Sequence, residues 1–176
     1  MSALEKSPTN PNHIYQNLYR FVLQRLPLTA FFGSSVNLPG ISLGKIRMDN
    51  IVNPIHVGGT KLEFEEFSLT FKVDEDLKNY QEIWNWMAGI ATPEDLKSFQ
   101  DLIESNKIGE RSKYNIFSDA TLTTLTNAHN TNVEITFKDM FPIALSGLDF
   151  EYTSNSPEIL TARVTFAYDT YSFRVT

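Results

Sequence analysis

Apolar and polar residues alternate with a period of two along most of this chain, a pattern typical of β-strands that bury one face. The clearest run is 62–73, in which Phe67 and Leu69 are separated by polar residues. Within this run the pair Glu65-Glu66 breaks the phase, which indicates a β-bulge. Strands are predicted at 18–25, 29–38, 50–57, 62–73, 119–126, 132–138, 145–153 and 159–168.

Turn residues separate these strands. The pair Pro39-Gly40 is predicted to end the second strand, because proline donates no ladder hydrogen bond, and to open a loop over 39–50. Pro54 makes the third strand an edge strand or a bent one. Hairpin turns are predicted at 58–59, 127–130 and 153–157.

The period changes after Asp74, where apolar residues recur at helical spacing. A helix is predicted over 76–88, capped by Asp74 or Asp76 and ended by Gly89. This interpretation places Trp84 in the core and Trp86 nearer the rim. The predicted core stripe is Leu77, Tyr80, Trp84 and Met87.

A chain of 176 residues is one domain by default. We expect a flexible N-terminal arm at 1–16 and a single domain at 17–176, with a helical insertion at about 90–114 that begins at Thr92-Pro93. The predicted fold class is mainly β: a sandwich or barrel of about eight strands with one or two inserted helices.

Composition excludes several kinds of chemistry. There are no cysteines, which excludes disulfides, thiolate metal sites and a cysteine nucleophile. Fifteen basic against twenty-one acidic side chains give a net charge of −6, which disfavours tight binding of nucleic acid. The longest apolar run, 86–91, is far shorter than a membrane span of ~20 residues.

No catalytic or metal-binding pattern stands out. The three histidines, His13, His56 and His129, lack partners at ligand spacing. The glycines of 58–61 lack the spacing of a phosphate loop. Carboxylate pairs such as Asp149 and Glu151 share the solvated face of a predicted strand. We therefore expect no cofactor and no enzymatic activity, and we interpret the chain as one that works by assembly through open strand edges.

Five segments carry a resemblance to a known family: 17–19 with the strand after it, Phe31-Phe32 leading to 37–40, 67–71 leading to 80–86, 133–142, and 163–168. In these segments the chain resembles the tail tube proteins of contractile-tailed bacteriophages, over about 17–173 except for 89–114. The resemblance implies a structural subunit of the phage tail in the virion, assembled in the host cytoplasm. It further implies a homo-oligomer: six copies form a ring, and rings stack into a hollow tube through which DNA passes transiently.

The implied partners are sheath proteins and baseplate or tail-terminator proteins, with no membrane. A baseplate tube-initiator or tail-completion ring is the alternative within this class. A monomeric β-sandwich binding module, with Trp84 or Trp86 stacking on a sugar, is the alternative from another class.

Two sets of residues are predicted to act in assembly. The first is a ring-stacking loop whose apolar residues have no predicted strand partner; together with the segment 1–12 it is expected to contact adjacent rings. The second is a set of polar residues on strand faces, whose acidity would keep DNA from adhering to a channel. The loop set is Leu38, Pro39, Gly40, Ile41 and Leu43, and the lumen set is Glu134, Asp149, Glu151, Thr153 and Thr165.

Overall fold

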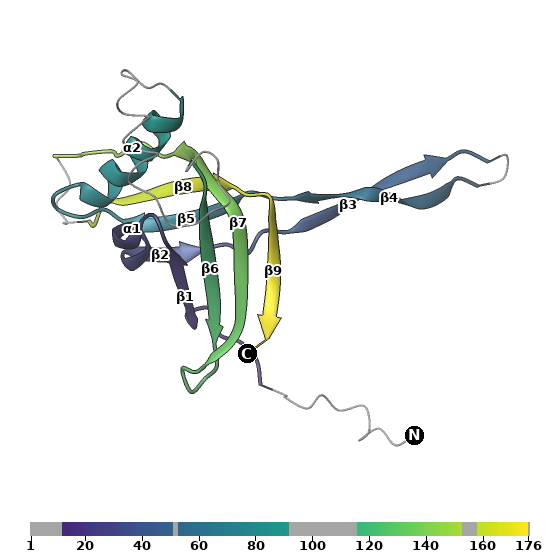
Figure 1. Cartoon of the computed structure of the whole chain (residues 1–176), viewed down its shortest axis with the longest axis horizontal. Helices are drawn as coiled ribbons and strands as arrows, with labels where there is room; N and C mark the ends of the chain where they lie inside the picture. Colours follow the sequence, from purple (N-terminus) through teal and green to yellow (C-terminus); the bar gives the residue numbers. More distant parts are fainter. Residues whose placement is uncertain (1–11, 51–52, 92–115, 153–157, 176) are drawn as a thin grey trace.

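The structure, a computed structural model, describes residues 12–50, 53–91, 116–152 and 158–175. Within these ranges the chain forms nine β-strands and two α-helices (Figure 1), which confirms the predicted mainly β class with inserted helices. In chain order the elements are β1 (Tyr19–Leu23), α1 (Pro27–Phe31), β2 (Gly33–Val36), β3 (Ile41–Met48), β4 (Ile55–Phe64), β5 (Phe67–Lys72), α2 (Lys78–Ala91), β6 (Ser118–Leu125), β7 (Thr131–Leu145), β8 (Thr161–Ala167) and β9 (Thr170–Val175).

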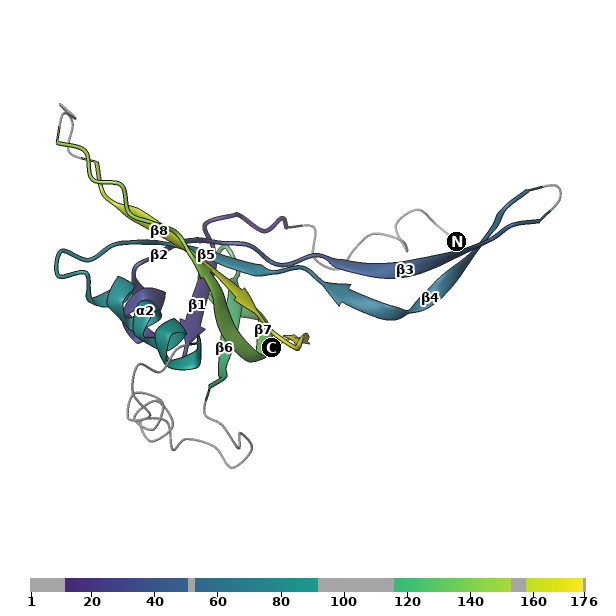
Figure 2. The ribbon, with the colours of Figure 1, turned by 90° about the horizontal axis from the view of Figure 1, so that it is seen from above.

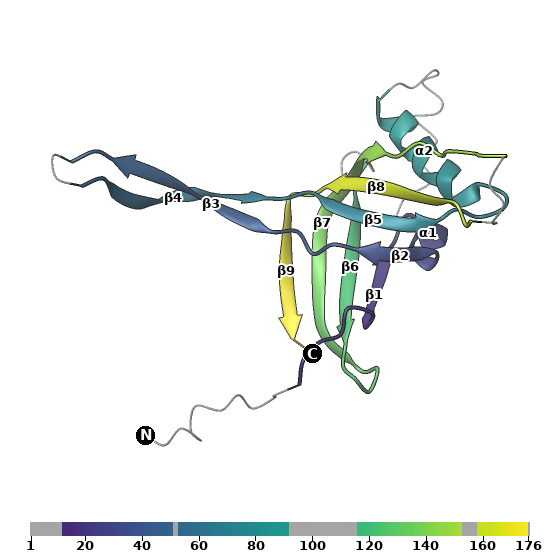
Figure 3. The same cartoon turned by 180° about the vertical axis from the view of Figure 1, so that it is seen from behind.

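Seven of these strands form one antiparallel sheet in the order β1-β6-β7-β8-β5-β2, with β9 also paired to β7. Strand β7 belongs to both halves of the sheet, because residues 133–138 pair with β9 and residues 141–145 pair with β8. Asp139 lies between these parts and has a φ of 54°. As a result β5 and β8 run across the direction of β6 and β9 (Figures 1 and 3).

The core lies between the two halves of this folded sheet. Phe67 on β5 is fully buried, and its ring centroid lies 5.1 Å from that of Phe21 on β1 and 5.0 Å from that of Phe137 on β7. Phe166 on β8 completes the cluster at 6.2 Å from Phe67. These aromatic contacts join strands that are distant in sequence, so the core holds the two halves together.

Helix α1 corrects the prediction of a strand over 29–38. Pro27 occupies the first turn, where the absent N–H costs nothing and the fixed φ suits a helix. Extended backbone begins only at Gly33. The predicted strand therefore exists only as the four residues of β2.

Helix α2 was predicted correctly as an element, but its buried face was predicted only in part: Tyr80 and Met87 pack against the core, whereas Leu77 and Trp84 are exposed. Trp84 is 58% exposed, whereas Trp86 is 2% exposed. The cause is Asn79 in the first turn, which is fully buried and donates from Nδ2 to the Lys72 carbonyl at 2.8 Å. Fixing this side chain in the core sets the rotation of the helix, so the residues four and seven positions later, Ile83 and Trp86, point inward.

Other boundaries also differ from the predictions. The expected loop over 39–50 is largely strand β3, and the glycines at 58–59 lie inside β4 rather than in a turn. The break at Glu65-Glu66 separates β4 from β5 instead of forming a bulge within one strand. Strand β7 ends at Leu145, so no strand covers 146–152, and β9 was not predicted.

The turn predicted at 127–130 is confirmed. The amide of Thr126 donates to the Asn130 carbonyl at 2.8 Å, and His129 adopts a φ of 59°. The turn predicted at 153–157, the helix expected from Thr92 and most of the predicted insertion lie outside the described residues, as do residues 1–11 of the predicted N-terminal arm.

Among the described residues, strands β3 and β4 pair only with each other, and they form a long hairpin that projects away from the rest of the molecule (Figures 1 and 2). Their ladder changes register between Leu43 and Lys45. Gly59 is required there, because a Cβ atom on it would lie 2.5 Å from the Gly44 carbonyl oxygen. The two strands therefore approach closely at a point where β4 cannot carry a side chain, whereas a Cβ atom on Gly44 would meet open space.

Candidate assembly surfaces

The outward face of the β1-β6-β7-β9 half is polar. Its opposite, inward face carries apolar residues such as Phe21, Leu122 and Ile135, which occupy one cross-strand row. Half of the outward side chains in its two central rows are Thr or Ser, and the charged ones are two arginines and one glutamate rather than a concentration of acids. We call this surface the polar face; its two central rows are Arg20–Thr123–Glu134–Arg174 and Val22–Thr121–Thr136–Ser172.

The predicted lumen residues do not come together on one surface. Glu134 lies on the polar face, in the same row as two arginines. Thr165 lies on β8, paired with Ser68 in the other half of the sheet. Asp149 and Glu151 follow the end of β7, outside any strand, and Thr153 lies outside the described residues.

The two lateral edges of this half-sheet are open. Within the described chain β1 pairs only with β6, and β9 pairs only with β7. Figures 1 and 3 show the two strands at opposite sides of the half-sheet. Each presents a row of backbone N–H and C=O groups that can pair with another strand.

The ends of the sheet path, β1 and β2, approach each other without pairing. The hydroxyl of Tyr19 donates to the Ser34 carbonyl at 2.9 Å, and burial raises the pKa of Tyr19 above its usual value. Between these two edges is a groove of about 1120 Å³, which we call the seam groove. Its lining includes Phe21, Val22, Leu23, Phe31, Val36 and Leu69.

The β3–β4 hairpin exposes many apolar side chains. Its cross-strand pairs include Leu43 with Leu62 and Ile46 with Val57. The hairpin therefore has no core of its own and presents apolar surface outside the body of the protein. The apolar residues more than 40% exposed are Ile41, Leu43, Ile46, Met48, Ile55, Val57 and Leu62.

Of the predicted loop set, Pro39 is buried at the root of the hairpin, whereas Leu38 and Gly40 are exposed. Ile41 and Leu43 lie on β3 and have strand partners, contrary to the prediction of unpaired loop residues. The ladder explains why sequence reasoning missed this strand: the alternation changes phase between Leu43 and Ile46, where the register shifts.

Two tyrosine hydroxyls tie the hairpin root to the body. Tyr171 on β9 donates to the Pro39 carbonyl at 3.2 Å, and Tyr168, just before β9, donates to the Glu65 carbonyl at 2.9 Å. Burial, with the neighbouring Tyr171 and Glu65, raises the pKa of Tyr168 to about 12. Both strands of the hairpin are thus held where they leave the sheet.

Other chemistry in the described residues is sparse. No group of three or more His, Cys, Asp or Glu side chains among them could hold a metal ion, and no helix among them is long and apolar enough to cross a membrane. Burial raises the pKa of Glu82 and lowers that of Arg25, whose guanidinium lies 4.9 Å from the ring centroid of Trp86.

This fold is shared with subunits of contractile injection systems. The chain is similar to a protein in the structure of the anti-feeding prophage tube-terminating cap, at 16% identity and a TM-score of 0.57, with all of both chains covered. It is also similar to a protein in the sheath–tube complex of the extracellular contractile injection system PVC, at 17% identity and a TM-score of 0.56, covering 100% of this chain and 99% of the other. A third similarity is to a protein of the anti-feeding prophage baseplate, at 12% identity and a TM-score of 0.51, covering 95% and 97%.

The fold is therefore that of tube, cap and baseplate subunits. The family model described as phage tail tube protein matches residues 14–174, and the chain belongs to that family. No curated protein matches it in sequence. Membership confirms the predicted family and supports a structural role in a phage tail.

Proposed function

We propose that this protein is the subunit of a phage tail tube, in which six copies form a ring and rings stack around a channel that conducts DNA. The observation that carries the proposal is the half-sheet β1-β6-β7-β9, which has an open edge on each side and one polar face. Family membership supports the structural role.

Ring closure follows from the two open edges. When β9 of one copy pairs with β1 of the next, both rows of unpaired backbone groups are satisfied. This contact joins two different surfaces, and such heterologous contacts generate closed rings when the rotation between copies closes. The half-sheets of all copies then form one barrel around the channel.

The polar face lines the channel in this proposal. Half of the side chains in its two central rows bear hydroxyl groups, and their two arginines and one glutamate leave a net excess of only one positive charge in each copy. The opposite, apolar face already packs in the core, which leaves the polar face to meet water and DNA. Weak phosphate contacts permit DNA to slide, because phosphate neutralisation is the main source of tight binding.

Electron microscopy of the purified protein tests the proposal. Rings of six copies, alone or stacked into tubes, are expected across a range of protein concentrations. A protein that remains monomeric at high concentration, with no rings in the images, would contradict it.

The hairpin offers a second test. We propose that Ile41 and Leu43, together with the rest of the β3–β4 hairpin, contact neighbouring copies. The Glu65 amide donates to the Gly40 carbonyl at 3.0 Å, so a short Gly-Ser linker can replace residues 41–64 without straining the body. The shortened protein should still fold, with a far-ultraviolet circular dichroism spectrum typical of a β-sheet protein, but should form no tubes. Normal tubes would show that the hairpin is dispensable for assembly.

A baseplate tube-initiator or tail-completion ring is the second candidate, favoured by the similarity to cap and baseplate proteins. Such a protein should form single rings that do not stack on themselves. The sugar-binding alternative loses Trp86, because its indole is buried and its Nε1 donates to the Ile116 carbonyl at 2.8 Å, whereas Trp84 is 58% exposed and is the indole on which this alternative now rests.

A further inference from the structure

The seam groove is a slot between two strand edges that no described part of the chain fills, and its lining mixes apolar side chains with polar ones such as Arg20, Gln24 and Ser35. Its walls include the exposed rings and methyl groups of Phe31 and Val22, which are 81% and 42% exposed. Such a slot is suited to an extended segment with apolar side chains, because the segment can bury those side chains and pair its backbone with the edge of β2 that is free among the described residues, while the edge of β1 pairs with β9 of the same neighbour.

The β3–β4 hairpin is a segment of that kind, and the same chain supplies it. Its seven apolar side chains, each more than 40% exposed, offer apolar surface that a neighbouring copy can cover. The close approach of Gly59 to the Gly44 carbonyl accompanies a hairpin whose two strands run together as one extended, twisted unit (Figure 2).

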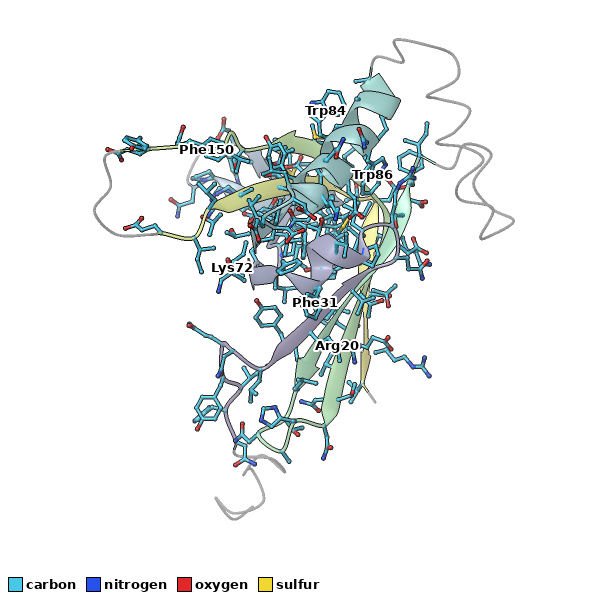
Figure 4. All side chains as sticks on the ribbon, turned by 90° about the vertical axis from the view of Figure 1, so that its left-hand side faces the viewer. Arg20, Phe31, Lys72, Trp84, Trp86 and Phe150 are labelled. Atoms are coloured by element: carbon cyan, nitrogen blue, oxygen red, sulfur yellow. The ribbon has the colours of Figure 1, made fainter. Side chains whose placement is uncertain are left out.

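The hairpin and the seam groove lie on opposite sides of the molecule. In Figures 1 and 3 the hairpin projects beyond the β9 edge, whereas β1, β2 and α1 lie toward the other side. Figure 4, drawn from the side opposite to the hairpin, shows Phe31 on α1 and Arg20 on β1 facing the viewer. The hairpin therefore cannot reach the groove of its own copy, but it points toward a copy placed beyond β9.

The lengths agree with this placement. Paired strands are ~4.8 Å apart, so β1 of a copy joined at β9 lies about 5 Å beyond that edge. The eight residues of β3 extend about 26 Å at ~3.3 Å each, which is far enough to pass that strand. The bonds of Tyr171 and Tyr168 to the hairpin root link its direction to β9, the strand that forms the joint.

We propose that the β3–β4 hairpin of one copy occupies the seam groove of the next copy in the same ring. This inference rests on the proposed ring of β1–β9 contacts and adds its second interface. It assigns the hairpin to contacts within a ring, whereas the sequence predicted contacts between rings for the loop over 39–50.

Cysteine crosslinking tests the inference directly, since the natural chain has no cysteine. The double variants L43C/F31C and M48C/F31C place one thiol on the hairpin and one in the groove. The control L43C/S172C replaces the groove thiol with one on the polar face. Each protein is examined for rings by electron microscopy, oxidised, and separated under denaturing, non-reducing conditions.

At least one groove variant should yield a ladder of covalent oligomers that ends at the copy number of one ring, with the control yielding none. A ladder that continues beyond one ring would place the hairpin against another ring and overturn the inference, as would rings with no crosslink in either groove variant. Absence of rings in the unmodified protein would instead overturn the proposed function and this inference with it.

A second comparison uses two exposed phenylalanines. Phe31→Ser removes the most exposed apolar side chain of the groove, and Phe150→Ser removes a ring that is 72% exposed elsewhere. The critical concentration for ring formation should rise about tenfold or more for Phe31→Ser, as expected for a central interface aromatic. Equal effects of the two substitutions would count against the groove as the interface.

Discussion

Replacing Trp86 with alanine should cost this protein far more stability than replacing Trp84, the reverse of what the helical periodicity predicts. Trp86 is 2% exposed and packs 6.2 Å from the ring of Phe166. Core truncations of this size cost about 3–5 kcal/mol. The substitution also removes the donor to the Ile116 carbonyl and the ring beneath Arg25, so we expect the upper part of that range. The side chain of Trp84 is more than half exposed, and surface substitutions usually change stability by about 0.5 kcal/mol or less.

The free energy of unfolding is best measured by urea titration, at protein concentrations below ring formation, because association adds apparent stability. Trp86→Phe serves as a second variant in case the alanine variant does not fold: it keeps an aromatic ring and loses the hydrogen bond, at a cost of about 1–2 kcal/mol from that bond. Trp84 then remains as the fluorescent reporter. The assigned rotation of α2 is wrong if Trp84→Ala proves as destabilising as Trp86→Ala while the free energy of unfolding depends on urea concentration with the same slope in both variants.

Three further predictions concern the hairpin root, the hairpin itself and the polar face. The folded-state pKa of Tyr168 is about 12, above its ordinary value of 10, so the folded state retains a proton that the unfolded state loses. Stability should therefore fall as pH rises from 10 towards 12 and less so in Tyr168→Phe, as measured by thermal unfolding; identical pH profiles would contradict the role of this hydroxyl. Gly59→Ala should force the hairpin strands apart and speed amide hydrogen exchange in β3 and β4, whereas Gly44→Ala, which has open space for a Cβ atom, should not; equal exchange in both variants would refute the close approach. Glu134→Lys should leave rings intact and increase retention of DNA at low salt, an effect that weakens as salt rises; unchanged retention would place Glu134 outside the channel.

Strands in which apolar and polar residues alternate regularly were predictable from the sequence. Residues 67–72 and 161–167 alternate cleanly because both strands lie in the middle of the sheet, where one face meets the core along the whole strand. The β6–β7 turn was predictable for a similar local reason, since its residues adopt turn conformations without help from distant contacts.

The hairpin and the candidate assembly surfaces were not predictable in the same way. Apolar residues of β3 and β4 are exposed to solvent, so no single buried face imposes a continuous pattern on them. The seam groove depends on β1 and β2, which lie next to each other only because the sheet folds across β7. The polar face is a property of register: the row that joins Arg20, Glu134 and Arg174 draws on strands from three parts of the chain.

The sequence by itself determined where the backbone is extended and where it is helical, because hydrophobic period and turn residues act over a few neighbouring positions. It also carried enough of its family pattern for the class of protein to be inferred. Only the tertiary structure decided the rotation of α2, since the buried hydrogen bonds of Asn79 outweigh the apolar periodicity around it. The same holds for the open edges and the projecting hairpin, because the absence of a partner within the chain is a property of the whole sheet and leaves no mark on any one strand.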